Sequence, residues 1–165
     1  MNKIFGVILM LCGTVSLILL LNRQKKKRLE TLSALMEFLR NLTYDVTDWK
    51  LPLEEAVLRR LKGLFPLHDI RTRFLTEKDR LGIRKALLFA IEAEASVETA
   101  PKELVVSYLS ELGLEKRTPT EELYHRVQTR LEEYYIEEKE ECKAHRQLTV
   151  GTVGGISAAA MILLL

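Results

Sequence analysis

Cysteine is nearly absent from this sequence, which has two cysteines in 165 residues. Cys12 lies in an uncharged segment and Cys142 in a charged one, so no disulfide framework can hold the fold together. Such cysteine use is typical of a domain in a reducing compartment. The core must therefore come from packing of apolar side chains.

The motifs of catalysis and of ligand binding are also missing. The three histidines, His68, His125 and His145, are far apart, and none lies next to a cysteine pair or in a His-Glu-x-x-His pattern, so no metal site is expected. A glycine-rich phosphate loop ending in Gly-Lys-Ser/Thr does not occur, and no serine has the surroundings of a nucleophile elbow. We predict a protein that is not an enzyme and uses no cofactor.

Charge is absent from the two ends of the chain. Ile4–Leu21 and Leu148–Leu165 are each 18 residues long and contain no Asp, Glu, Lys or Arg. As helices they would each be about 27 Å long, enough to cross the hydrocarbon core of a membrane. The sequence predicts a transmembrane helix over residues 1–21, a helical-bundle domain over 22–147, and a second transmembrane helix over 148–165.

The cations beside these runs predict their orientation. Just after the first run, five of the six residues 23–28 are basic, and Lys143 and Arg146 precede the second run; the five are Arg23, Lys25, Lys26, Lys27 and Arg28. Because basic flanks stay in the cytoplasm, we expect both termini outside the cytosol and the domain inside it. A cleaved signal peptide would have its cations before the apolar run instead. The same cations would attract anionic membrane lipid by about 1 kcal/mol each.

Apolar residues of the middle segment recur at helical spacing, which predicts an all-α domain. A first helix is expected over about residues 3–46, a second from Pro52 to near Gly63, and a short third one around Phe65–Leu75. A fourth is expected over about residues 81–91, with Gly82 weakening its start. A fifth should begin at Pro101 and end at Gly113.

The last helix has the clearest start in the sequence. Thr118 can cap it, Pro119 suits the first helical position, and Glu121 can complete a capping box. No proline or glycine follows until Gly151. We therefore predict one helix from about residue 119 into the second apolar run.

An acidic segment on this helix is the first of two candidate interaction sites. Six of the ten residues 132–141 are Glu, which fits a solvated helix face or a docking surface for a basic partner. Glu137, Glu138 and Glu141 are the candidate partner contacts. The domain has 24 Lys and Arg, all but Lys3 of the chain's 25, against 23 Asp and Glu, a balance that argues against binding to nucleic acid.

Small residues in the second apolar run are the other candidate site. Gly151 with Gly155, and Gly154 with Ala158, form two small-xxx-small pairs. Such pairs let helix backbones approach closely in lipid. We expect contact with the first run or with another subunit of a homo-oligomer, although a weakly apolar anchor can also simply tolerate small residues.

Three local patterns follow one another along the chain: Tyr44 followed by Leu51–Ala56, then Leu109–Gly113, then the glycines of the final run. Together they resemble the stage III sporulation protein AB family. Its Tyr and its Thr-Pro-Leu-x-Glu-Ala stretch correspond to Tyr44 and Leu51–Ala56, and its helix end corresponds to Leu109–Gly113. The residues that carry the resemblance are Leu42, Tyr44, Pro52, Leu53, Ala56, Leu112 and Gly113, with the glycines of the final run. The sequence departs from the family pattern at Asn41, Lys116 and Thr120, where the family has Glu, Asp and Gln, and the segment from Gly63 to Leu81 is shorter than usual.

The resemblance implies a function that composition alone does not. Proteins of this family belong to a secretion-like channel between mother cell and forespore, and their cytoplasmic domain is similar to the inner-membrane platform protein of type II secretion. The implied partners are a cytoplasmic secretion-type ATPase, stage III sporulation protein AA, and other membrane proteins of the channel. The implied location is the mother-cell membrane. The alternative hypotheses are a two-span regulatory or scaffolding protein unrelated to sporulation, and a membrane enzyme with an unrecognised site.

Overall fold

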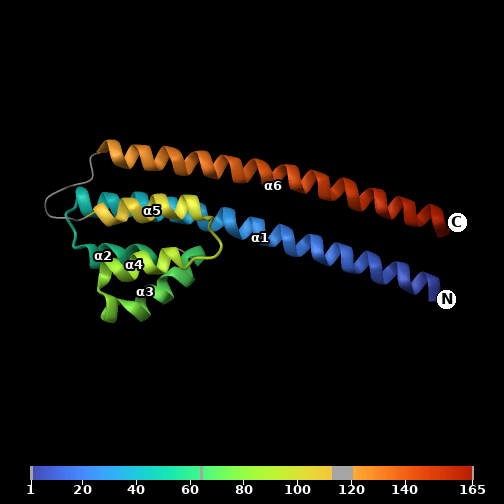
Figure 1. Ribbon diagram of the computed structural model, residues 1–165, viewed down its shortest axis with the longest axis horizontal. Helices are drawn as coiled ribbons and strands as arrows, with labels where there is room; N and C mark the ends of the chain where they lie inside the picture. The colour runs from blue at the N-terminus through green and yellow to red at the C-terminus, as the bar shows by residue number, and fades with distance from the viewer. Residues whose placement is uncertain (1, 64, 113–120, 165) are drawn as a thin grey trace. The chain divides into compact units, whose positions relative to one another are not determined.

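The computed structural model describes residues 2–63, 65–112 and 121–164, and in these ranges it is helical with no strand (Figure 1). The α-helices are α1 (Asn2–Thr47), α2 (Leu53–Leu61), α3 (His68–Leu81), α4 (Ile83–Glu92), α5 (Thr99–Glu111) and α6 (Glu121–Leu164), and a 3₁₀ turn, η1 (Phe65–Leu67), precedes α3. The prediction of an all-α protein is confirmed.

The chain divides into two compact units. One unit joins Met1–Lys27 to Glu137–Leu165, and the other comprises Arg28–Ile136. The predicted domain boundaries at residues 22 and 147 fall inside α1 and α6, and they stay predictions. We refer to Arg28–Ile136 as the helical domain.

The core of the helical domain is built from one stripe of each helix. Leu35, Phe38 and Leu42 of α1 are almost completely buried, at the three- and four-residue steps that place side chains on one helix face. The other helices contribute Ala56, Val57, Leu61, Ile70, Phe74, Ala86, Leu87, Ala90, Ile91, Val105, Tyr108, Leu109, Val127 and Leu131. Burial of an apolar side chain contributes about 1.5–3 kcal/mol, so these stripes explain why the helices pack around one core.

Backbone geometry at the helix ends explains where α1 and α3 stop. The N–H of Leu51 donates to the carbonyl oxygen of Asp45 at 3.0 Å, which closes the end of α1, and Lys50 adopts a φ of 49°. Gly82 adopts a φ of 76° between α3 and α4. Both conformations lie in the left-handed region, which glycine enters without strain; at position 50 a lysine occupies it.

The third and fifth helices differ from the prediction. The third helix is not short, because α3 continues through Leu75 to Leu81 and only the turn at Gly82 ends it. The fifth helix begins two residues earlier than predicted, at Thr99. Pro101 lies in its first turn, where backbone N–H groups have no helical acceptor and a missing one costs nothing.

The structure describes the end of α5, but the residues just before α6 lie outside its described ranges. Leu112 leaves the helix with extended backbone, and Arg84 donates to the carbonyl oxygens of Ser110 and Leu112 at 3.0 and 2.7 Å. This side chain satisfies carbonyl groups that the helix end leaves free. Thr118, Pro119 and Gly113 lie outside the described residues. From Glu121 onward, α6 is continuous to Leu164, as predicted.

Candidate interaction surface

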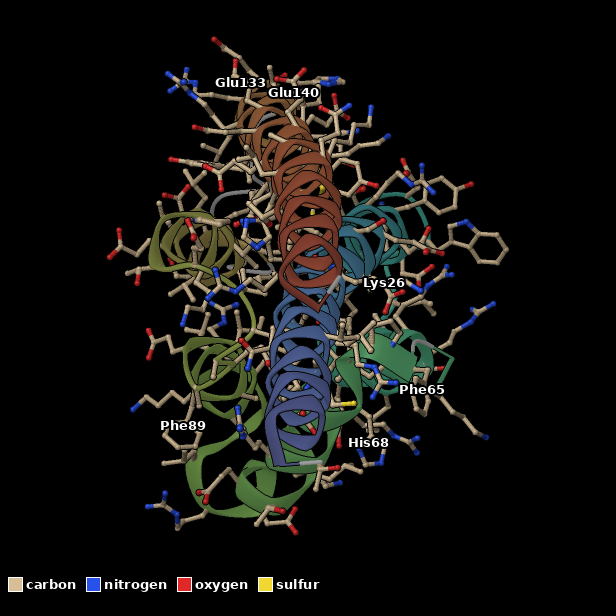
Figure 2. All side chains as sticks on the ribbon, turned by 90° about the vertical axis from the view of Figure 1, so that its right-hand side faces the viewer. Lys26, Phe65, His68, Phe89, Glu133 and Glu140 are labelled. Atoms are coloured by element: carbon tan, nitrogen blue, oxygen red, sulfur yellow. The ribbon has the colours of Figure 1, made fainter. Side chains whose placement is uncertain are left out.

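The basic segment after the first uncharged run lies on α1. Arg23, Lys26 and Lys27 are exposed, and Figure 2 labels Lys26. Lys25 is half-buried, with its Nζ atom 3.9 Å from Oε2 of Glu141. An exposed pair at this distance contributes little to stability, so the cations remain suited to the orienting role predicted for them.

The other three residues of the predicted cation set are Arg28, Lys143 and Arg146. Arg28 belongs to the helical domain, where one of its guanidinium nitrogens lies 3.5 Å from Oε1 of Glu98. Lys143 is exposed on α6, whereas the side chain of Arg146 lies outside those that the structure describes. The role of these residues in membrane orientation stays a prediction.

The predicted partner contacts are on the surface of α6. Glu137 and Glu141 are exposed and Glu138 is half-buried. The Glu141 carboxylate faces Lys25 as described above, so part of its charge is already balanced. The exposed carboxylates of the acidic segment are thus accessible to a partner.

The glycines of the second uncharged run have no close neighbour where the structure describes them. A Cβ atom built on Gly151 or Gly155 would meet nothing within 4 Å, and the same holds for Gly13 of the first run. The side chain of Ala158 and the surroundings of Gly154 lie outside the described set. Close packing at these positions therefore remains an expectation for contact with another subunit.

The residues that carry the family resemblance are mostly structural. Leu42, Ala56 and Leu112 are completely buried. Leu53 is half-buried at the start of α2, and Pro52 is exposed just before it. Among the departures, Asn41 is half-buried, and Lys116 and Thr120 lie outside the described residues, as does Gly113.

Tyr44 is different, because it is half exposed. Its ring lies next to that of Trp49, with ring centroids 6.4 Å apart, and 62% of Trp49 is exposed. Phe65 and Phe89 are also exposed, and their side chains point outward from the ribbon in Figure 2. Exposed aromatic residues are frequent in protein interfaces.

A buried ion pair that the sequence analysis missed joins α1 to α2. Asp45 is 1% exposed, and both of its carboxylate oxygens accept hydrogen bonds from Arg60 at 2.5 Å. The hydrogen-bonded guanidinium of Arg60 holds the pKa of Asp45 below its ordinary value, although burial acts in the opposite direction. Asp45 lies three residues after Leu42, on the buried stripe of α1, and this position was the available signal. A charge at a buried position needs a partner.

A second buried carboxylate, Glu94, follows α4. Its Oε1 atom accepts hydrogen bonds from the backbone N–H and the hydroxyl of Ser96, at 3.1 and 2.5 Å. Its Oε2 atom is buried without a hydrogen bond, 3.9 Å from a guanidinium nitrogen of Arg73. The Ser96 hydroxyl contacts that of Thr31 on α1, and Lys102 donates to the Glu94 carbonyl oxygen. These contacts fix the α4–α5 connection onto α1 and α3.

A third polar contact links α1, α5 and α6. The hydroxyl of Tyr108 lies 2.8 Å from that of Thr43, and the rings of Tyr108 and Tyr124 have centroids 6.0 Å apart. Burial raises the pKa of both tyrosines. Both phenols therefore stay protonated at neutral pH.

One hollow in the helical domain has a mixed polar and apolar lining. It has a volume of about 300 Å³ and lies between α1 and α6. Its lining residues are Ser33, Met36, Glu37, Arg40, Gln128, Glu132 and Tyr135. We call it the α1–α6 groove. Sequence reasoning did not identify it, because it depends on which faces of two distant helices meet.

The two buried carboxylates are held by contacts within the fold. Asp45 is engaged by Arg60, and the Glu94 carboxylate holds the backbone of its own connection. In the part of the chain that the structure describes, no group of three or more His, Cys, Asp and Glu side chains is placed to hold a metal ion. Over the residues whose side chains are described, which leave out most of the two uncharged runs, no helix is long and apolar enough to cross a membrane.

Comparisons with protein-family models, with curated proteins and with solved structures find no match for this chain. The resemblance to the stage III sporulation protein AB family therefore stays a prediction from the sequence.

Proposed function

We propose that this chain is a non-enzymatic membrane platform that anchors a cytoplasmic secretion-type ATPase. One observation carries the proposal. The 18-residue uncharged runs occupy the beginning of α1 and the end of α6, while the remainders of the same two helices supply buried residues to one helical domain. A domain held by both of its terminal helices suits an adaptor between a membrane and a soluble partner.

The polar side chains of the domain support an adaptor role. The buried carboxylates are committed to contacts that join helices, as with Asp45 to Arg60. Exposed charges of both signs instead cover the surface of α6, including Glu137, Arg130 and Glu133. Exposed charges speed association and select partners more than they strengthen binding.

The membrane arrangement is part of the proposal. Both runs are proposed to span the same membrane, with Arg23–Arg28 and Lys143–Arg146 on its cytoplasmic side and both termini outside the cytosol. The resemblance to the stage III sporulation protein AB family supports the mother-cell membrane as the location. It also supports stage III sporulation protein AA as the ATPase, within a channel of further membrane proteins.

Reporter fusions test the membrane arrangement. Alkaline phosphatase fused after Leu165 should be active, because it works only outside the cytosol, and a fluorescent protein that folds only in the cytosol should be dark there. The opposite pair of results at Leu165 would refute the two-span topology. Reversing Arg23, Lys25, Lys26, Lys27 and Arg28 to Glu should scramble insertion if these charges set the orientation.

Binding to the ATPase tests the function. The full chain in lipid nanodiscs should bind the hexameric secretion-type ATPase, and binding should weaken as salt is raised, because a Debye length of about 8 Å at physiological ionic strength screens exposed charges. Calorimetry at two salt concentrations measures both effects. Absence of binding at low salt, with both proteins folded, would refute the platform function and favour the two-span regulatory alternative.

A further inference from the structure

The α1–α6 groove places carboxylates beside apolar surface, and a long side chain that ends in a cation can contact both. Glu37 belongs to its α1 side and Glu132 to its α6 side, and both residues are exposed. Met36 and Tyr135 are half-buried and supply apolar surface. The side-chain amide of Gln128 donates to Glu132 at 3.0 Å, which orients that carboxylate. The groove therefore offers carboxylate acceptors beside a methyl group and an aromatic ring.

The charges of the groove favour a cation over an anion. Its lining includes the two carboxylates and one cation, Arg40, so its formal charge is −1.

We propose that the α1–α6 groove receives a Lys or Arg side chain from a helix of the partner protein, with its methylenes on Met36 and Tyr135 and its charge at Glu37 and Glu132. Long basic side chains lay their stems on apolar surface and keep the charged end at polar groups. A guanidinium matches carboxylates with paired hydrogen bonds. This inference rests on the proposed function for the identity of the partner, and it places the contact in the groove instead of at Glu137, Glu138 and Glu141.

The first experiment tests the groove without the partner. The chain has four methionines, and Met36 is the only one within the helical domain, Arg28–Ile136, so its methyl group is readily assigned by NMR in full chain labelled with ¹³C-methyl methionine. Titration with n-butylguanidinium should shift the Met36 signal saturably. The E37Q/E132Q variant should lose this shift, and the matched variant E137Q/E141Q should keep it. Butanol and butyrate, which lack the cation, should leave the signal unchanged.

The results of this titration decide the proposal. A Met36 signal that does not respond, or that responds equally to butanol, would overturn the cation site. An equal response in E37Q/E132Q would overturn the role of the two carboxylates. Both are exposed, so the substitutions should leave the fold intact, which a thermal unfolding curve checks.

The second experiment adds the partner. In nanodiscs, E37Q/E132Q should weaken binding of the secretion-type ATPase by about tenfold or more, since hydrogen bonds to charged groups contribute about 1.5–3 kcal/mol. E137Q/E141Q should bind within about twofold of the unsubstituted chain, because rim charges contribute little. The reverse ranking would overturn the groove as the contact. Absence of ATPase binding to the unsubstituted chain would instead refute the proposed function, and the Met36 titration would still decide the groove.

Discussion

Removing Arg60 should destabilise the helical domain more than neutralising its partner Asp45. The Asp45 side chain is 2% exposed and that of Arg60 is 27% exposed. An Arg60→Met variant leaves a buried carboxylate without its cation, whereas an Asp45→Asn variant leaves a guanidinium that still reaches water. The asymmetry follows from this difference in burial.

The magnitude can be worked from the geometry. At 2.5 Å and an effective dielectric constant of about 20, the Coulomb attraction is about 7 kcal/mol. Desolvation of the carboxylate offsets several kcal/mol of it, and removing one partner of such a pair costs about 3–5 kcal/mol. We expect about 3 kcal/mol for Arg60→Met, and about 1–2 kcal/mol for Asp45→Asn because a polar group keeps part of the hydrogen bonding.

The pH dependence gives a second readout with a definite sign. The pKa of Asp45 is lowered by its hydrogen bonds to Arg60, so its stabilising contribution is complete above the ordinary Asp pKa of about 4 and is lost as pH falls through the lower folded value. In Arg60→Met the hydrogen bonds to Asp45 are gone. Desolvation is then the largest influence on the pKa of Asp45 and raises it, while the charge of Arg59 opposes it less strongly, and protonation of Asp45 relieves the unpaired charge. The stability difference between the two proteins should therefore shrink as pH is lowered from 7 toward about 4.

Urea unfolding of the full chain in detergent micelles, followed by far-ultraviolet circular dichroism, measures both effects. Arg59→Met is the matched control, because Arg59 lies directly before Arg60 on α2 and is exposed. This substitution should change the free energy of unfolding by less than about 0.5 kcal/mol. An Arg60→Met variant no less stable than Asp45→Asn, or a difference independent of pH, would refute the reasoning.

Four further substitutions test the backbone and the packing. Glu133→Pro in the middle of α6 should cost about 3 kcal/mol or more and kink the helix, and a melting temperature equal to that of Glu133→Ala would contradict a packed, continuous helix. Lys50→Gly should stabilise by about 0.5–1 kcal/mol by relieving a φ of 49°, whereas Gly82→Ala should destabilise by about 1–2 kcal/mol at a φ of 76°; equal effects in urea unfolding would exclude backbone strain as the cause. Tyr108→Phe should lower the free energy of unfolding by about 1 kcal/mol by removing the hydrogen bond to Thr43. The same substitution in a Thr43→Val background should cause no such decrease.

The helices were predictable from the sequence because their signals are local. The steps of three and four along Leu35, Leu39 and Leu42 indicate a buried face, and α1 carries it as expected. Proline at position 52 marks the start of α2 for reasons of backbone geometry alone. Gly82, which we expected inside the start of the fourth helix, instead separates α3 from α4. The predicted bounds were wrong for the third helix, which is longer than expected, and for the fifth helix, which begins earlier. Both bounds depend on a single turn residue or proline, which is compatible with more than one position relative to the helix end.

The candidate sites divide in the same way. The sequence directly reveals the charge-free runs, the basic segment Arg23–Arg28 and the acidic segment of α6, since each depends only on neighbouring residues. The sequence could predict that Asp45 needs a cationic partner, because periodicity places it on the buried face of α1. It could not predict that this partner is Arg60. Ser96, which holds the Glu94 carboxylate, and Thr31, whose hydroxyl it contacts, are 65 residues apart in the sequence, and no local signal connects them.

The sequence by itself determined the helical class, the two uncharged ends and the charge that flanks them, because these follow from composition and from a periodicity of 3.6 residues. Only the tertiary structure decided which faces of α1 and α6 meet in the helical domain, and so created the groove between Met36 and Tyr135. The physical reason is that packing depends on the joint fit of many side chains from distant segments. A groove is a property of that fit and of no single helix.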